Sequence, residues 1–278
     1  MLKAQQFEQY RQEGYVHVPG VVPQEVLDGA REVLEEWVDT LADHWIAEGR
    51  LENRGEQFGF TDRLLQLWHK AGQPTYSRSP RRDLVGPAMY RLLAHPALLD
   101  LAAGLLGTDE ILVHGIFNAR PKLPAQKWTD TPWHQDAQYY RDAESVHVVS
   151  IWFPLQDVDQ TNSCMKVAPR QHKGVLFADY HDEETGFKGI DRQEWDQLPG
   201  KTVPMAAGDA LCFTQLTPHR ALPNQTQAVR WSMDFRYEAL ATATESGLRM
   251  GFVGRSRQGA TACREWLAKW EGMGWGQY

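Results

Sequence analysis

The sequence contains few cysteines and no pairs of them. Only Cys164, Cys212 and Cys263 occur among 278 residues, and they are far apart. An odd number of scattered cysteines predicts neither a disulfide framework nor a closed zinc site built from paired cysteines. We interpret all three as buried apolar residues.

Long apolar runs and clusters of basic residues are missing as well. No stretch approaches the roughly 18 apolar residues of a membrane helix, and the first eight residues lack the apolar run of a signal peptide. The net charge is −7, from 29 basic and 36 acidic residues, without the basic face that nucleic-acid binding requires. We expect a cytoplasmic protein that binds neither membranes nor nucleic acid, while its oligomeric state is not predicted.

The spacing of apolar residues divides the chain into two parts. In the first, about 1–108, steps of three and four residues predict a long helix over 23–41 and shorter ones over 63–69, 83–93 and 96–106. In the second, about 109–240, short β-rich stretches at 111–117, 146–155, 210–213 and 229–237 are typical of a sandwich or barrel. Residues 14–18 predict a further strand and residues 260–270 a closing helix. Without a repeat or flexible linker, we predict a single domain over 1–278, with the helical part packed on one β core.

Side chains that can bind a metal follow two of these strands. His134 and Asp136 flank Gln135, and on an extended backbone residues two apart point the same way. His219 follows the strand 210–213, and Arg230 lies on the next one. A hairpin turn centred between residues 224 and 225 would place Arg230 opposite His219.

Two histidines and one carboxylate on one face of iron(II) leave three coordination positions open, as in non-heme iron oxygenases. A 2-oxo acid can fill two of them and dioxygen the third. The far carboxylate of 2-oxoglutarate then needs a bidentate partner, which favours arginine, and Arg230 is placed for this role. A zinc hydrolase or isomerase, or a non-catalytic small-molecule-binding jelly-roll protein, remain alternatives, although zinc chemistry would leave Arg230 without a role.

In their order along the chain, these motifs resemble the phytanoyl-CoA dioxygenase family of iron(II)- and 2-oxoglutarate-dependent oxygenases. The similarity covers residues 14–20, 118–122, 133–136 and 162–174, then Gly208-Asp209, His219, Pro223-Asn224 and Arg230. The resemblance implies a mainly β fold with flanking helices and a double-stranded β-helix (jelly-roll, cupin-like) core. It also implies that His134, Asp136 and His219 are the catalytic iron ligands and that Arg230 holds 2-oxoglutarate.

The family pattern suggests further site residues. It assigns Asn118 and Trp152 to the 2-oxoglutarate pocket. Many relatives carry Ser or Thr two residues after the distal histidine, whereas this chain has Ala221, so another side chain or a water must supply that hydroxyl. Loops around the mouth usually carry specificity, and the predicted substrate contacts are Trp133, Gln138, Tyr139, Tyr140 and Arg170.

The resemblance implies hydroxylation of a C–H bond in a small organic metabolite, with conversion of 2-oxoglutarate and dioxygen into succinate and carbon dioxide. Related halogenases replace the carboxylate ligand by a small residue, so Asp136 argues against halogenation. We interpret Asp234 and Arg236 as a structural polar pair. The sequence does not name the substrate.

Overall fold

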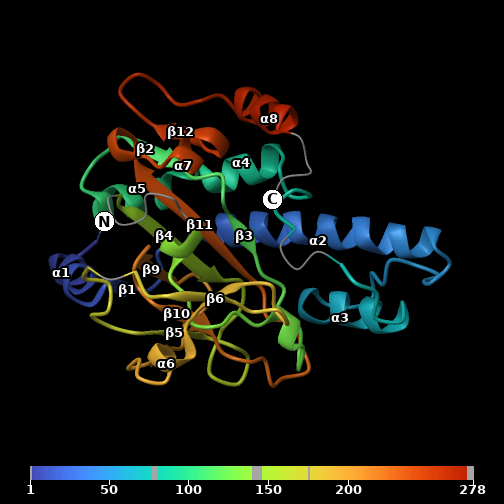
Figure 1. Cartoon of the computed structure of the whole chain (residues 1–278). Coiled ribbons are helices and arrows are strands. Elements are labelled where there is room, and N and C mark those ends of the chain that lie inside the picture. The colour runs from blue at the N-terminus through green and yellow to red at the C-terminus, as the bar shows by residue number, and fades with distance from the viewer. Residues whose placement is uncertain (1, 77–79, 140–145, 175, 274–278) are drawn as a thin grey trace.

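The computed structural model describes residues 2–76, 80–139, 146–174 and 176–273. Most of its helices lie in the first part of the chain (Figure 1). The helices are α1 (Ala4–Glu13), α2 (Gln24–Ala47), α3 (Phe60–Lys70), α4 (Pro87–Leu93), α5 (Pro96–Leu106), α6 (Arg192–Trp195), α7 (Glu245–Met250) and α8 (Cys263–Gly272), with short 3-10 helices η1 (Lys127–Thr129), η2 (Asp136–Tyr139) and η3 (Leu240–Thr242).

The strands form a large sheet, a small sheet and a hairpin, and every pairing is antiparallel. The large sheet has the order β1 (Tyr15–Val18), β9 (Ala210–Thr214), β4 (Val148–Pro154), β11 (Ser232–Ala239), β2 (Ile111–Val113) and β12 (Phe252–Arg255), with β3 (Asn118–Ala119) also paired to β11. The small sheet has the order β10 (His219–Ala221), β5 (Met165–Val167) and β8 (Lys201–Val203). The hairpin joins β6 (Asp179–His181) to β7 (Lys188–Ile190).

Local sequence signals explain where several elements begin and end. Helix α5 starts with Pro96 at its first position, where a missing N–H costs nothing, and His95 accepts a hydrogen bond from the backbone of Ala97. It stops at Gly107, which adopts the left-handed conformation with φ 72°. The predicted bounds 96–106 are therefore confirmed, whereas α2 extends six residues beyond the predicted end, from 41 to 47.

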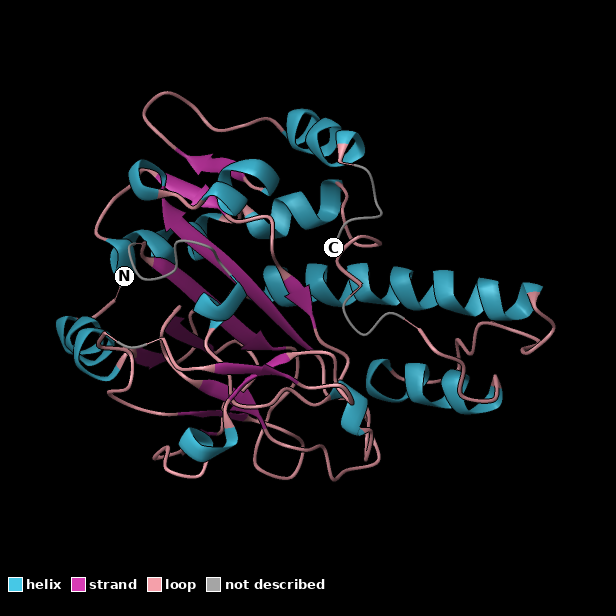
Figure 2. Ribbon diagram, viewed as in Figure 1, coloured by secondary structure: helices cyan, strands magenta, loops and turns pink. Residues whose placement is uncertain are grey.

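Alternation along the strands separates two cores. In β4, Val149, Ile151 and Phe153 belong to the large apolar cluster that includes α2, α4 and α5, while Trp152 belongs to a second cluster shared with the small sheet. Figure 2 shows these helices covering one face of the large sheet. The face opposite the helices is thus left to line an interior between the two sheets.

Strand β11 follows the same alternation with polar residues on its inner face. Met233, Phe235 and Tyr237 join the helix-side cluster. Asp234 and Arg236, between them, are also buried, with exposures of 6% and 4%. Buried charged side chains need partners, so this stripe marks the interior where a site is to be sought.

One pairing predicted from the sequence is wrong. His219 pairs with Val167 of the small sheet, and Arg230 forms a separate bridge with Lys122. The segment after β10 crosses from the small sheet to the large one instead of folding back on itself, so Arg230 does not lie opposite His219. Both side chains nevertheless line one cavity.

Within the described ranges no helix has both the length and the apolar composition needed to cross a membrane. The organisation of the whole chain as one domain stays a prediction.

Candidate functional site

His134 and His219 are brought together by a two-residue antiparallel bridge. The backbone N–H of each donates to the carbonyl of the other, at 3.1 and 3.0 Å, and the ring centroids are 4.2 Å apart. Both side chains are almost completely buried. The bridge joins a loop ahead of η2 to the first residue of β10, which is how two distant segments present their imidazoles at one point.

The two imidazoles are oriented in the same way. Nδ1 of His134 lies 2.9 Å from the carbonyl of Pro132, and Nδ1 of His219 lies 3.0 Å from that of Thr217. A carbonyl only accepts, so each Nδ1 carries the hydrogen and each Nε2 keeps a free lone pair. Burial lowers the pKa of His134 to about 3 and also lowers that of His219, so both rings are neutral, as metal binding requires.

Asp136, the first residue of η2, supplies the carboxylate. The Ser150 hydroxyl donates to Oδ2 at 2.5 Å, and Arg236 donates to both oxygens, at 3.1 and 2.8 Å. Burial by itself raises the pKa of Asp136, but the charge and the hydrogen bonds of the Arg236 guanidinium outweigh it, and the pKa lies below its ordinary value. The carboxylate is therefore ionised.

These three residues fit a metal. One potential ligand atom from each of His134, Asp136 and His219 lies within 4.8 Å of the others, and this is the one such buried cluster in the described ranges. Two neutral imidazoles and one carboxylate suit iron(II) and leave coordination positions for a chelating acid and dioxygen.

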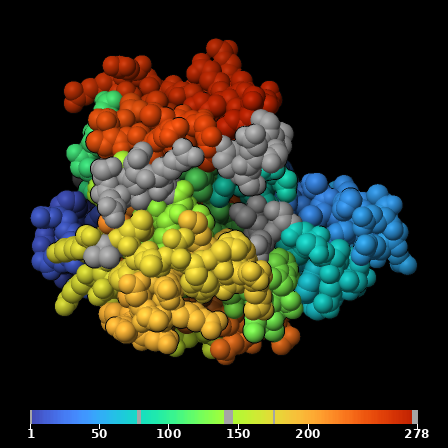
Figure 3. All heavy atoms as spheres, in the orientation of Figure 1, coloured from blue at the N-terminus to red at the C-terminus, as the bar shows by residue number. Residues whose placement is uncertain are grey.

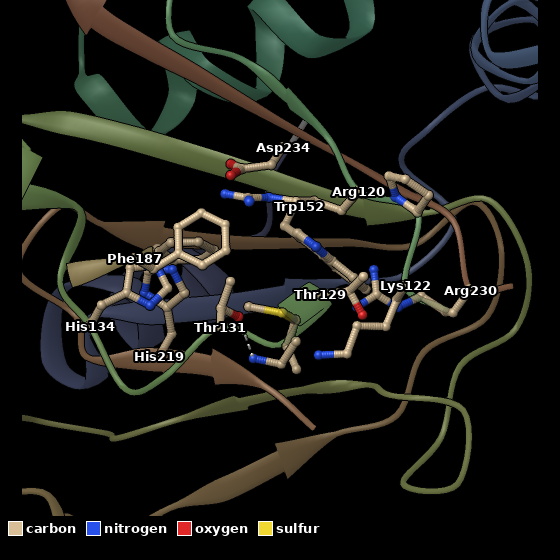
Figure 4. A pocket seen from close by; sticks show the side chains of 14 residues that line it. Arg120, Lys122, Thr129, Thr131, His134, Trp152, Phe187, His219, Arg230 and Asp234 are labelled. Carbon is tan, nitrogen blue, oxygen red and sulfur yellow. Dashed lines mark hydrogen bonds between the residues drawn. The ribbon is translucent and has the colours of Figure 1, made fainter. Parts of the chain in front are cut away.

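A cavity opens beside the two histidines (Figure 4). Its walls come from both sheets and from the loops around η1 and β7. The lining residues are Arg120, Pro121, Lys122, Thr129, Thr131, His134, Trp152, Met165, Phe187, Phe213, His219, Ala221, Arg230 and Asp234.

Arg230 lines this cavity with only 2% of its surface exposed. Its guanidinium donates to the hydroxyls of Ser232, at 2.5 Å, and Ser163, at 3.2 Å, and lies 5.5 Å above the Trp152 ring. Burial, then the nearby Arg120, lowers the pKa of Arg230 to about 9, so it stays charged at pH 7. It makes no carboxylate ion pair in the part of the chain that the structure describes. The Arg230 guanidinium is thus held in position, charged and able to bind an anion.

Two other cations share the cavity. The Lys122 ammonium lies 2.5 Å from Asp130 Oδ1, and burial, opposed by Asp130, lowers the pKa of Lys122 to about 8. The Arg120 guanidinium lies 5.0 Å above the Phe187 ring. The interior is therefore rich in positive charge.

The sequence profile described as phytanoyl-CoA dioxygenase matches residues 10–232. The chain belongs to this family. Mouse peroxisomal phytanoyl-CoA dioxygenase is 30% identical over 148 residues, which are 51% of this chain and 43% of that protein, so the chain matches less than half of that relative. A methylphosphonate hydroxylase from Gimesia maris is 27% identical over 256 residues, covering 91% of this chain and 86% of that protein.

Solved structures show the same fold. EvdO2 from Micromonospora carbonacea var. aurantiaca, complexed with 2-oxoglutarate, has a TM-score of 0.60 at 19% identity and covers 89% of this chain and 96% of its own. The epimerase SnoN, in complex with Fe3+, alpha ketoglutarate and nogalamycin RO, has a TM-score of 0.53 at 22% identity, with coverages of 90% and 84%. The predicted fold class is confirmed. By family the chain is a 2-oxoglutarate-dependent dioxygenase, and iron(II), 2-oxoglutarate and dioxygen are the family's cofactors.

Not every residue expected from the family pattern lies at the cavity. Trp152 does. Asn118 does not: its amide donates to Asp234 at 3.0 Å and accepts from Arg81 at 2.7 Å, so it braces β3 against β11. Arg170 points elsewhere too, because its guanidinium pairs with Glu13 at 2.8 Å on an exposed surface.

The predicted substrate contacts next to the ligand motif differ in where their side chains lie. Trp133 is buried against Ala168 and Ile190, and Gln138 bonds to nearby backbone, so neither lines the cavity. Tyr139 is 44% exposed, its ring is perpendicular to that of His134 with the centroids 6.4 Å apart, and its hydroxyl accepts from the backbone N–H of Lys188. Tyr140 lies outside the described residues.

The structure also contains groups that the family pattern did not assign. Thr131 lines the cavity and its hydroxyl accepts from the backbone N–H of Ala221 at 3.2 Å, so a hydroxyl stands next to the position where relatives carry Ser or Thr. Asp234 and Arg236 do form the expected polar pair, at 3.0 Å, but Arg236 also holds Asp136. The alternation of polar and apolar residues in β11 is the sequence signal that indicates Asp234 and Arg236 as inward-facing residues.

Proposed function

We propose that the protein is an iron(II)- and 2-oxoglutarate-dependent hydroxylase acting on a C–H bond of a small organic metabolite. The reaction consumes the metabolite, 2-oxoglutarate and dioxygen, and yields the hydroxylated product, succinate and carbon dioxide. The observation that carries this proposal is that one cavity is lined both by His134 and His219, which form a cluster with Asp136, and by Arg230, whose guanidinium is free to bind an anion. Membership of the family supports the reaction class.

In this proposal His134 and His219 hold the metal through Nε2, and Asp136 holds it through a carboxylate oxygen. Iron(II), bound there together with 2-oxoglutarate, would activate dioxygen, which is the oxidant: one oxygen atom would enter the substrate C–H bond and the other the succinate. The carbonyls of Pro132 and Thr217 keep both imidazoles in the ligating tautomer.

Arg230 binds the far carboxylate of 2-oxoglutarate. Ser163 and Ser232 hold its guanidinium, and the Trp152 ring covers it. An arginine positioned in this way offers two parallel N–H donors to one carboxylate. Apolar neighbours such as Met165 and Phe213 keep water from the reacting end of the cavity.

The test is an anaerobic titration with iron(II) and 2-oxoglutarate, followed by the visible charge-transfer band of their chelate. We expect a band in the wild type, loss of iron binding in Asp136→Ala, and at least tenfold weaker 2-oxoglutarate binding with retained iron in Arg230→Ala. Arg170→Ala, which removes an exposed arginine outside the cavity, serves as the control. Tight zinc binding without a band would overturn the proposal in favour of metal-dependent hydrolysis.

Turnover is then measured as succinate release in the presence of candidate substrates, and methylphosphonate, named by the Gimesia maris relative, is the first compound to test. A small-molecule substrate agrees with the family. The predicted cytoplasmic location and lack of a nucleic-acid partner stay predictions.

A further inference from the structure

Arg120 differs from the other cations of the cavity. Lys122 pairs with Asp130, and Arg230 bonds to two serine hydroxyls. The Arg120 guanidinium has neither a hydrogen bond nor an ion pair among the described residues; its one contact of this kind is the Phe187 ring, 5.0 Å away. A guanidinium that contacts only an aromatic ring keeps its N–H donors available for a ligand.

Its position separates it from the 2-oxoglutarate end. In Figure 4 the Arg120 side chain runs between Asp234 and Phe187 toward the two histidines, whereas Lys122 and Arg230 lie at the other end of the cavity. Phe187 immediately precedes β7, and the β6–β7 hairpin lies on the front face of the molecule (Figures 1 and 3). Arg120 therefore stands where a substrate would approach the metal ligands.

The charges of the loaded site do not balance without a further anion. The cavity and its ion-pair partners contain four cations, Arg120, Lys122, Arg230 and Arg236, against three carboxylates, Asp130, Asp136 and Asp234. Iron(II) and doubly ionised 2-oxoglutarate cancel each other. One positive charge is left over. Arg120 attracts the Asp234 carboxylate without forming an ion pair among the described residues, and Asp234 already pairs with Arg236. A charge held in a largely enclosed site is costly unless a counter-charge binds.

We propose that Arg120 binds an oxyanion of the primary substrate, so that the substrate is a small organic acid, a carboxylate or a phosphonate, oxidised at a carbon close to that group. This inference rests on the proposed function. In Figure 4 Asp234 and Phe187 lie on opposite sides of the Arg120 guanidinium, which leaves the end directed toward the two histidines for the anion.

The experiment uses calorimetry on the anaerobic enzyme loaded with iron(II) and 2-oxoglutarate. The probes are methylphosphonate and butyrate, each compared with a neutral counterpart, dimethyl methylphosphonate and butyramide. We expect at least one anion to bind more tightly than its neutral counterpart. In Arg120→Gln its affinity should fall at least tenfold, in Arg120→Lys it should recover in part, and in the control Arg170→Gln it should not change.

The chelate band separates the possible failures. Arg120→Gln should show the wild-type band and wild-type 2-oxoglutarate affinity, which also reports an intact site. The inference is overturned if no anion is preferred over its neutral counterpart, if Arg120→Gln binds the anion as tightly as the wild type, or if it weakens 2-oxoglutarate binding as Arg230→Gln does. A wild-type protein without the band would instead refute the proposed function, and the same calorimetry on the metal-free protein would still decide whether Arg120 binds anions.

Discussion

Replacing Arg236 by methionine tests whether the metal ligand is held by its ion pair. The Arg236 guanidinium donates to both oxygens of Asp136 and, at 3.0 Å, to Asp234 Oδ2. It also donates to the carbonyl of Ile116 at 3.2 Å. Methionine has a similar length without the charge, so Arg236→Met leaves two buried carboxylates without their shared cation.

The size of the effect follows from burial. Asp136 is 2% and Asp234 6% exposed, and removing one partner of a buried ion pair costs about 3–5 kcal/mol because the remaining charge cannot reach water. At about 2–4 °C per kcal/mol for a chain of this size, the metal-free variant should unfold about 6–20 °C below the wild type. Iron(II) affinity should fall about 10–100-fold, since the ligand loses its orienting partner.

Thermal unfolding of the metal-free proteins at pH 7, followed by circular dichroism, measures the first effect, and iron(II) titration measures the second. Arg257→Met is the matched control, because that side chain is 94% exposed, and it should change stability by less than about 0.5 kcal/mol. A loss of less than about 2 °C in Arg236→Met, together with unchanged iron affinity, would refute the argument that Arg236 holds Asp136.

Three other substitutions have defined outcomes. Ser150→Ala removes the hydroxyl that donates to Asp136 and should cost about 1–3 kcal/mol and weaken iron(II) binding; wild-type values in both titration and unfolding would exclude this role. Gly14→Ala should lower the unfolding temperature more than Gly259→Ala, since both have positive φ but only at Gly14 would the new methyl lie within 2.7 Å of side-chain atoms; equal losses would contradict this. Because burial lowers the pKa of Lys122 to about 8, the folded state binds fewer protons than the unfolded state between pH 8 and about 10.5. The stability of the wild type relative to Lys122→Met in urea should therefore rise from pH 7 to pH 10, and a difference that is constant with pH would refute it.

Signals confined to a few neighbouring residues predicted structure well. Helix α5 begins at Pro96 and ends before Gly107 as expected, because a proline and a glycine act on the backbone next to them. The proximity of His134, Asp136 and His219 followed from their order in the family pattern, and the geometry agrees with it. The bounds of α5 depend little on how distant segments pack, whereas the approach of His219 to His134 does depend on it and was predicted only by the family pattern.

Pairings between distant segments were predicted less well. The turn residues around 224 suggested a hairpin, but the chain crosses between sheets there, so Arg230 pairs with Lys122. Loop positions such as Arg170 depend on which helix end lies nearby, here Glu13 at the end of α1. Arg120 belongs to the 118–122 motif, but the motif assigned it no role, because its surroundings come from Phe187 just before β7 and from Asp234 on β11.

The inner face of β11 explains why the site is one electrostatic unit. Asp234 and Arg236 are two residues apart, so both point into the interior, and Arg236 links Asp234 to the metal ligand Asp136. Asp234 in turn lines the cavity that Arg120 enters. Opposite charges therefore alternate from the proposed iron ligand to the proposed substrate cation. Because Asp234 and Arg236 share a hydrogen bond and Arg236 also holds Asp136, the effects on stability of changing Asp234 and of changing Arg236 will not add.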